Sequence, residues 1–294
     1  MAVSILHRCP RFTAGAALLL LLKQIVLGTG LLAQVSQPIT AIQMVNQMVQ
    51  AETAAWRNRQ HFLYENQERS NRTNGRLWEE LVVETPDGSL PRLIAEDGKP
   101  LPNSRQKEED KRIAYWASHP SDFRRARQRR QQDEARMPDL LKEVPSIFLF
   151  RTISSEGQYT RIAFQPNPSF HEKSYQDRVV HAMSGMLLIH TTDMRLCELD
   201  ARLQHRVEFG YGILGELSDK THFFVARQEV SPAQWTTTKI RVHLDGSILL
   251  LKSISRDVEA SRHGFQGVAP DLTVAEAAAI VRSNTFYGRP GRPR

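Results

Sequence analysis

The stretch from residue 61 to residue 96, "HFLYENQERSNRTNGRLWEELVVETPDGSLPRLIAE", decides the fold class. Its apolar residues alternate with polar ones, as the side chains of a half-buried β-strand do. Asn74-Gly75 is a strong hairpin signal, and Pro86-Asp87-Gly88 and Asp97-Gly98 mark further turns. The stretch therefore predicts a meander of three short antiparallel strands.

Residues 38–57, "PITAIQMVNQMVQAETAAWR", precede the meander and have apolar residues close to helical spacing. Pro38 suits the first turn of a helix, because its missing N–H would have no partner there. The pattern predicts an amphipathic helix that packs on the sheet.

Strand patterns return after residue 144 and continue to about residue 260, separated by turn signals such as Gly157, Ser218-Asp219 and Asp245-Gly246. Short strands with turns between them and no helical crossovers predict an antiparallel sheet curled into a barrel or half-barrel. We therefore expect an α+β fold: a single curled half-barrel domain over residues 34–260, covered by the N-terminal helix. The tail, residues 261–294, contains a capping box, Thr273-x-x-Glu276, which predicts a short helix.

A charged insertion at about residues 102–144 interrupts the strands. We expect two helices here, broken near His119-Pro120, with Ser121 or Asp122 capping the second. The second helix contains "DFRRARQRRQQDEAR", residues 122–136, which has six arginines in fifteen residues. Because these arginines fall on nearly every face of a helix, we expect much of it to be solvated.

The charge distribution argues against a nucleic-acid-binding protein. The formal net charge is +7, and removing residues 1–33, with three basic residues and no acid, leaves 36 − 32 = +4. Residues 105–136 alone contain ten Lys/Arg and six Asp/Glu, also +4, so the rest of residues 34–294 is balanced. A contact of the insertion with anionic headgroups or an acidic partner, weakened by salt, is the remaining functional interpretation. Its candidate residues are Arg124, Arg125, Arg127, Arg129 and Arg130.

The first 33 residues have the features of a secretory signal: basic residues, then an apolar run, then small residues. Lys23 interrupts the apolar run and argues against a clean membrane span, although an uncleaved N-terminal anchor is the alternative. We expect an exported protein of the periplasm or cell envelope. Cleavage would leave Cys197 as the single cysteine, and we expect it to be a buried, inert thiol.

No catalytic or metal-binding motif stands out, because H-E-x-x-H, C-x-x-C and G-x-S-x-G are all missing from the sequence. His171-Glu172 with His181 or His190 is the one imaginable ligand set, and ordinary histidines of strands and loops are the favoured interpretation. We expect no catalytic residues, no metal and no cofactor.

The stretch "LIAEDGKPL", Leu93 to Leu101, and the order of elements around it resemble the LolA/LolB-like family of periplasmic lipoprotein carriers. The resemblance covers roughly residues 38–260 in element order and is closest to uncharacterised exported bacterial members, which also have a charged helical insertion after the turn. It implies an open antiparallel half-barrel whose concave face is covered by helices and shelters lipoprotein acyl chains. The sequence has no convincing match to the strand motif with the carrier's cavity arginine, so no gating residue is carried over.

These observations predict a non-enzymatic carrier or sensor that binds a lipid, an acyl chain or another apolar ligand. The candidate cavity residues are Leu81, Val83, Ile94, Phe148, Phe150, Ile162, Phe164, Leu187, Ile189 and Phe223. The alternative is that these residues form a closed core under helix 38–57. In that case we expect a protein–protein interaction or scaffold module of the envelope that uses the charged insertion. A hydrolase without a recognisable motif is a third, less favoured interpretation.

Overall fold

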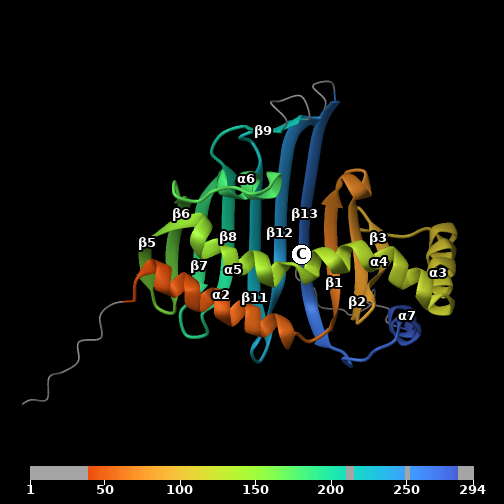
Figure 1. Cartoon of the computed structure of the whole chain (residues 1–294). Helices are drawn as coiled ribbons and strands as arrows, with labels where there is room; N and C mark the ends of the chain where they lie inside the picture. Colours follow the sequence, from red (N-terminus) through yellow and green to blue (C-terminus); the bar gives the residue numbers. More distant parts are fainter. Residues whose placement is uncertain (1–38, 210–214, 249–251, 284–294) are drawn as a thin grey trace, which may run out of the picture. The chain divides into compact units, whose positions relative to one another are not determined.

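An antiparallel sheet of thirteen strands is the centre of the fold in the computed structural model, which describes residues 39–209, 215–248 and 252–283 (Figure 1). The strand order is β4-β3-β2-β1-β13-β12-β11-β8-β7-β6-β5, with β10 paired to β12 and β9 to β10. The end strands β4 and β5 do not pair with each other, so the sheet is open. The strands are β1 (Phe62–Ser70), β2 (Leu77–Thr85), β3 (Gly88–Glu96), β4 (Lys99–Pro100), β5 (Phe148–Glu156), β6 (Tyr159–Pro166), β7 (Met183–His190), β8 (Arg195–Leu203), β9 (Val207–Phe209), β10 (Gly215–Leu217), β11 (His222–Ser231), β12 (Gln234–Ile248) and β13 (Lys252–Gly267).

The predicted meander is confirmed, because β1 pairs with β2 and β2 with β3, both antiparallel. Asn74 and Gly75 both have positive φ angles, 52° and 74°, as the turn signal requires. Asp97 and Gly98, with φ of 50° and 75°, make the next turn, into the two-residue strand β4.

The first and last strands in the sequence, β1 and β13, pair in the middle of the sheet. β1 pairs antiparallel with β13, the last strand, so the N-terminal meander joins the β5–β13 strands edge to edge. The sheet therefore extends to Gly267, beyond the expected boundary at residue 260.

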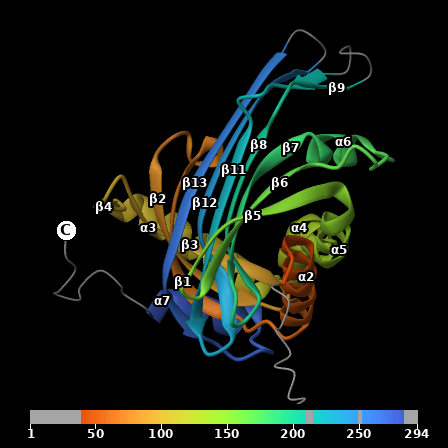
Figure 2. The ribbon, with the colours of Figure 1, turned by 90° about the vertical axis from the view of Figure 1, so that its left-hand side faces the viewer.

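Helices cover both faces of this sheet. They are α2 (Ala41–Arg57), α3 (Asn103–Ser118), α4 (Pro120–Ala135), α5 (Met137–Ile147), α6 (Tyr175–His181) and α7 (Val274–Ser283), with a short 3₁₀ helix η1 (Asn71–Thr73). α2, α4 and α5 lie on one side of the sheet, with α4 and α5 nearly in line, while α3 and α7 lie on the other side (Figures 1 and 2). We call the two sides the α2 face and the α7 face.

Helix α2 confirms a helix within the predicted range 38–57, but it begins at Ala41 rather than at Pro38, which lies outside the described residues. Thr40 is its N-cap and forms a capping box with Gln43: the Thr40 Oγ1 accepts from the Gln43 N–H at 3.3 Å, and the Gln43 side chain accepts from the Thr40 N–H at 2.9 Å. The predicted C-terminal helix is also present as α7, where Thr273 N–H donates to Glu276 Oε2 at 2.9 Å.

The prediction of two helices in the insertion is wrong, because the chain forms a third, α5, after Arg136. Pro138 in its first turn is compatible with a helix start, and the apolar side chains of Leu141, Val144 and Ile147 pack on the sheet. The predicted break at His119-Pro120 is present, but the N-cap is His119 without a side-chain hydrogen bond, and neither Ser121 nor Asp122 is the capping residue. The short helix α6, between β6 and β7, was also not expected.

The described residues from Thr40 onward form one compact unit. The predicted export signal, residues 1–33, lies outside the described residues. No helix in the described part of the chain is both long enough and apolar enough to cross a membrane.

Candidate functional site

The ten predicted cavity residues lie in two separate apolar clusters. One cluster packs against α2 and α5 and contains the buried residues Phe148, Ile162, Phe164, Leu187 and Ile189, with Phe150 and Phe223 partly buried beside them. The other packs against α3 and α7, with Phe123 from the first turn of α4, and contains Leu81 and Val83, with Ile94 partly buried beside them.

Strand register explains why these clusters lie on opposite faces. Paired residues of an antiparallel sheet point to the same face, and one row of pairs on the α2 face runs across Leu187, Leu199, Val225, Ile240, Ala260 and Glu68. Glu68 and Leu63 are five residues apart on β1, so their side chains point to opposite faces. Leu63 pairs with Val83, which therefore faces α7. The ten residues thus do not line one shared space.

The apolar cluster on the α2 face is packed as a core. Val45 of α2 is 0% exposed, and so are Ile162 and Ile189 of the strands that it covers. Met44, Met48 and Val49 fill the remaining contact between α2 and the sheet. This arrangement corresponds to the closed-core alternative.

A buried ion cluster fastens α2 to the sheet. Glu52, 6% exposed, accepts from Arg195 Nε and Nη2 at 3.0 and 3.1 Å and from the Leu196 N–H at 3.0 Å. Arg227 Nη1 lies 2.5 Å from Glu52 Oε1. Burial raises the pKa of Glu52, but the two arginines outweigh burial and hold the pKa below its ordinary value. Glu52 is therefore charged at neutral pH.

Two hollows in the surface lie away from the predicted cavity residues. The larger, of about 620 Å³, lies where β1 ends beside β13, and its lining includes Arg69, Asn71, Arg241, His243 and Glu259. The smaller, of about 360 Å³, lies between the β2–β3 turn, the α3–α4 break and the start of α7. None of the ten candidate residues lines either hollow.

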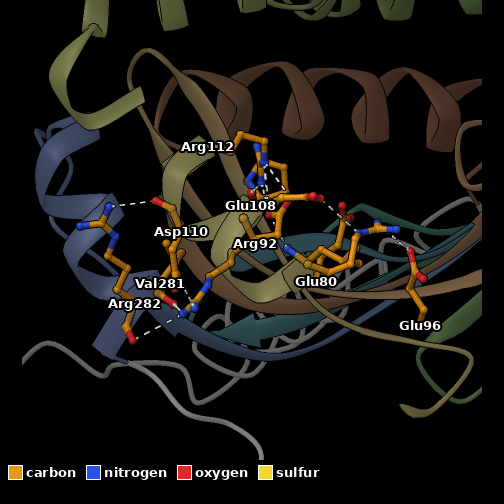
Figure 3. Close-up of polar contacts among 12 residues, drawn as sticks. Glu80, Arg92, Glu96, Glu108, Asp110, Arg112, Val281 and Arg282 are labelled. Carbon is orange, nitrogen blue, oxygen red and sulfur yellow. Dashed lines mark hydrogen bonds and ion pairs between the residues drawn. The ribbon is translucent and has the colours of Figure 1, made fainter. Parts of the chain in front are cut away.

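An ion pair with β3 and a hydrogen bond from α7 hold the insertion in place (Figure 3). Arg92 of β3 donates to Asp110 Oδ1 of α3 at 2.7 Å and to the Val281 carbonyl of α7 at 2.8 Å. Arg282 of α7 donates to the Asp110 carbonyl at 3.1 Å. Ile113 and Phe123, both 0% exposed, add apolar anchors. The start of α4 is therefore fixed to the sheet, which determines the faces that α4 and α5 present to solvent.

One stripe of α4 and α5 points toward the sheet. Its members are at least partly buried and recur every three or four residues: Phe123, Arg127, Gln131, Glu134, Pro138 and Leu141. Gln131 Nε2 donates to the Pro86 carbonyl at 3.0 Å, and Glu134 lies 3.7 Å from Arg59. Arg136, between the helices, has helical backbone angles, so α5 continues the direction of α4.

The five predicted partner-binding arginines differ in their exposure to solvent and in their ion pairs. Arg127 points inward over the Phe123 ring, and burial together with Arg112, Arg130 and Arg72 lowers its pKa. Three others remain exposed beside a carboxylate: Arg124 with Asp87 at 3.6 Å, Arg125 with Asp122 at 3.9 Å and Arg130 with Glu134 at 3.0 Å. Arg129 is exposed and, within the described residues, has no ion pair.

Three residues next to these arginines were not among the predicted site residues. Arg136 is exposed and has no ion pair in the part of the chain that the structure describes. Met137 and Leu140 follow it, and their exposed fractions are 42% and 49%. We call Arg125, Arg129, Arg136, Met137 and Leu140 the basic ridge. Pro138, in the first turn of α5, is the sequence signal for this helix, and recognising it would have suggested that Met137 and Leu140 share the outward side with Arg136.

Among the described residues, the histidines and Cys197 form no recognisable reactive site. His181 Nδ1 lies 2.6 Å from Glu172 Oε1, but His171 bonds the Ser169 carbonyl, and no group of three metal-binding side chains occurs among residues 39–209, 215–248 and 252–283. Cys197 is buried as predicted, and burial raises the pKa of its thiol to about 11.

Comparison with known proteins identifies no relative. No family model matches the chain, and neither does any curated protein or solved structure. The functional argument therefore depends on the geometry above.

Proposed function

We propose that this chain is an exported, non-enzymatic binding module of the cell envelope whose contact surface is the helical insertion, and that its partner is anionic. The observation that carries the proposal is the basic ridge, where Arg129 and Arg136 are exposed without an ion pair in the described residues. From Pro120 to Arg136 the chain has six arginines and three acids, a net charge of 6 − 3 = +3. A partner with negative charge would be attracted to this surface.

The tight packing beneath α2 favours binding through the protein surface rather than binding of a ligand inside the fold. A carrier needs vacant apolar volume, and side chains of α2 occupy the space above Ile162 and Ile189. The insertion, in contrast, is fastened at α3 by Arg92 and Asp110 and leaves the outward side of α4 in solvent.

Site-specific photo-crosslinking in the natural host tests this proposal. Gln132 is exposed on α4 beside the ridge, and a benzophenone amino acid there should form adducts that disappear in R129Q/R136Q. Gln228 of β11, also exposed, is the matched control position and should form none of these adducts. Identical adduct patterns from both positions would refute the proposal. Deleting the insertion is a poor test, because it would remove Ile113 and Phe123 from the core.

Binding of an apolar ligand in a curled, LolA-like half-barrel is the second candidate function. It is favoured by the open sheet, whose largest apolar cluster lies beneath α2 on one face. In this function α2 would move aside to admit an acyl chain, at about 0.8 kcal/mol gained for each buried methylene. Native mass spectrometry of the protein from an exporting host should then reveal bound lipid. This function would be ruled out if the purified protein contained no lipid and did not bind a fluorescent fatty acid.

A further inference from the structure

The basic ridge combines exposed positive charge with exposed apolar side chains on one side of a continuous helical segment, and two of its arginines, Arg129 and Arg136, have no ion pair within the described residues. Each arginine of the ridge is two residues from a position of the inward stripe, for example Arg129 between Arg127 and Gln131. Two residues correspond to about 200° around an α-helix, so these arginines point away from the sheet. Met137 and Leu140 extend the same outward side along α5.

We infer that the basic ridge docks on a membrane surface that contains anionic lipids. This inference rests on the proposed function and names the partner of the same surface. Arginine guanidinium groups bind lipid phosphates, and their apolar stems allow them to reach the headgroups from a helix that lies in the interface. Met137 and Leu140 would enter the boundary between headgroups and acyl chains, as apolar residues of interfacial helices do.

The shape of the ridge favours a lipid surface over a protein partner. Protein interfaces are usually centred on pockets that receive anchor side chains, but no ridge residue lines either of the two hollows described above. A fluid headgroup layer needs no matching pocket and can adapt to a protruding helix. The neighbouring carboxylates Asp133 and Glu143 are exposed and would repel anionic headgroups. The attraction between the arginines and the headgroups must outweigh this repulsion, so we expect binding to be sensitive to salt.

Vesicle co-sedimentation of the chain purified from an exporting host tests this inference. The probes are vesicles of phosphatidylcholine with one-quarter phosphatidylglycerol and vesicles of phosphatidylcholine alone, which also measure any binding by residues 1–38. We expect binding to the anionic vesicles that is lost at high salt. It should weaken about tenfold or more in R129Q/R136Q, and similarly in M137S/L140S.

The matched control is R151Q/R202Q, which removes the same charge from exposed positions on β5 and β8 and should bind like the wild type. Equal loss in both arginine pairs would overturn the inference, because overall charge would then explain binding. Wild-type binding by M137S/L140S, or no preference for anionic vesicles, would overturn it as well. If vesicle binding fails while Gln132 still crosslinks to a protein, the membrane inference is wrong and the contact-surface proposal stands. Failure of both experiments overturns both.

Discussion

Replacing Glu52 by glutamine should destabilise the protein strongly, because Glu52 is the only carboxylate among the described residues that pairs with Arg195 and Arg227. Arg195 is 8% exposed at its side chain and Arg227 is 18% exposed, so water can replace little of the lost interaction. Removing one partner of a buried ion pair typically costs 3–5 kcal/mol, and we expect about 3 kcal/mol because Arg227 retains some solvent contact.

The pH dependence gives a second measure of the same cluster. The folded-state pKa of Glu52 is lower than its ordinary value of 4.5. A lowered carboxyl pKa contributes stability that is fully present above the unfolded-state value and is lost as the pH falls through the folded-state value. The difference in unfolding free energy between wild type and E52Q should therefore be constant near neutral pH and should shrink below about pH 4.5.

Urea unfolding followed by circular dichroism measures these differences. The triple variant E52L/R195M/R227M is the control: it replaces the whole cluster by apolar residues and should lie within about 1 kcal/mol of wild type, because no buried charge is left unpaired. A loss below about 1 kcal/mol in E52Q would show that the cluster does not hold α2 on the sheet, and would refute the reasoning.

Three further predictions test how the side chains pack. Ile162→Ala should cost about 3 kcal/mol in urea unfolding because Ile162 is 0% exposed, whereas Ile153→Ala, 41% exposed, should change stability by less than about 0.5 kcal/mol. The Cys197 thiol, with a pKa of about 11, should react with a disulfide reagent at pH 8 only slowly in the folded protein and rapidly in urea; equal rates would contradict its burial. Gly185→Ala would force a methyl group onto a backbone carbonyl of β8 and should lower stability by about 2 kcal/mol or more, whereas Gly267→Ala meets nothing closer than 4.0 Å and should be nearly neutral by thermal unfolding.

Local sequence patterns were sufficient for most individual elements of the fold. The helix predicted for residues 38–57 is present over residues 41–57, and the three strands predicted within residues 61–96 are also present. The turn between β1 and β2 requires positive φ angles at Asn74 and Gly75, and asparagine and glycine adopt this conformation readily. The capping box at Thr273 and Glu276 likewise marked the beginning of α7. Each of these signals acts over a few residues, so a single sequence contains it.

The pairing of β1 with β13 was not predictable from these patterns, because it joins residues almost 200 positions apart in the chain. This pairing decides which face of the sheet each alternating residue occupies. The alternation of apolar and polar residues showed that Val83 and Ile162 each lie on the buried side of their own strand. It could not show that the two residues lie on opposite faces of one sheet. A cavity assigned by alternation alone therefore combined two clusters that the sheet separates.

The arginine-rich segment shows the same dependence on long-range structure in its electrostatics. In the sequence its six arginines are equivalent, and their number suggests a strong field. The position of Phe123 in the core fixes the rotation of α4, and this rotation turns Arg127 inward, where burial lowers its pKa. The same rotation leaves Arg129 and Arg136 exposed without an ion pair in the described residues. The charge that a partner meets is therefore set by the buried stripe of the helix as much as by the number of arginines, and changing Phe123 should alter binding at the ridge without touching a charged residue.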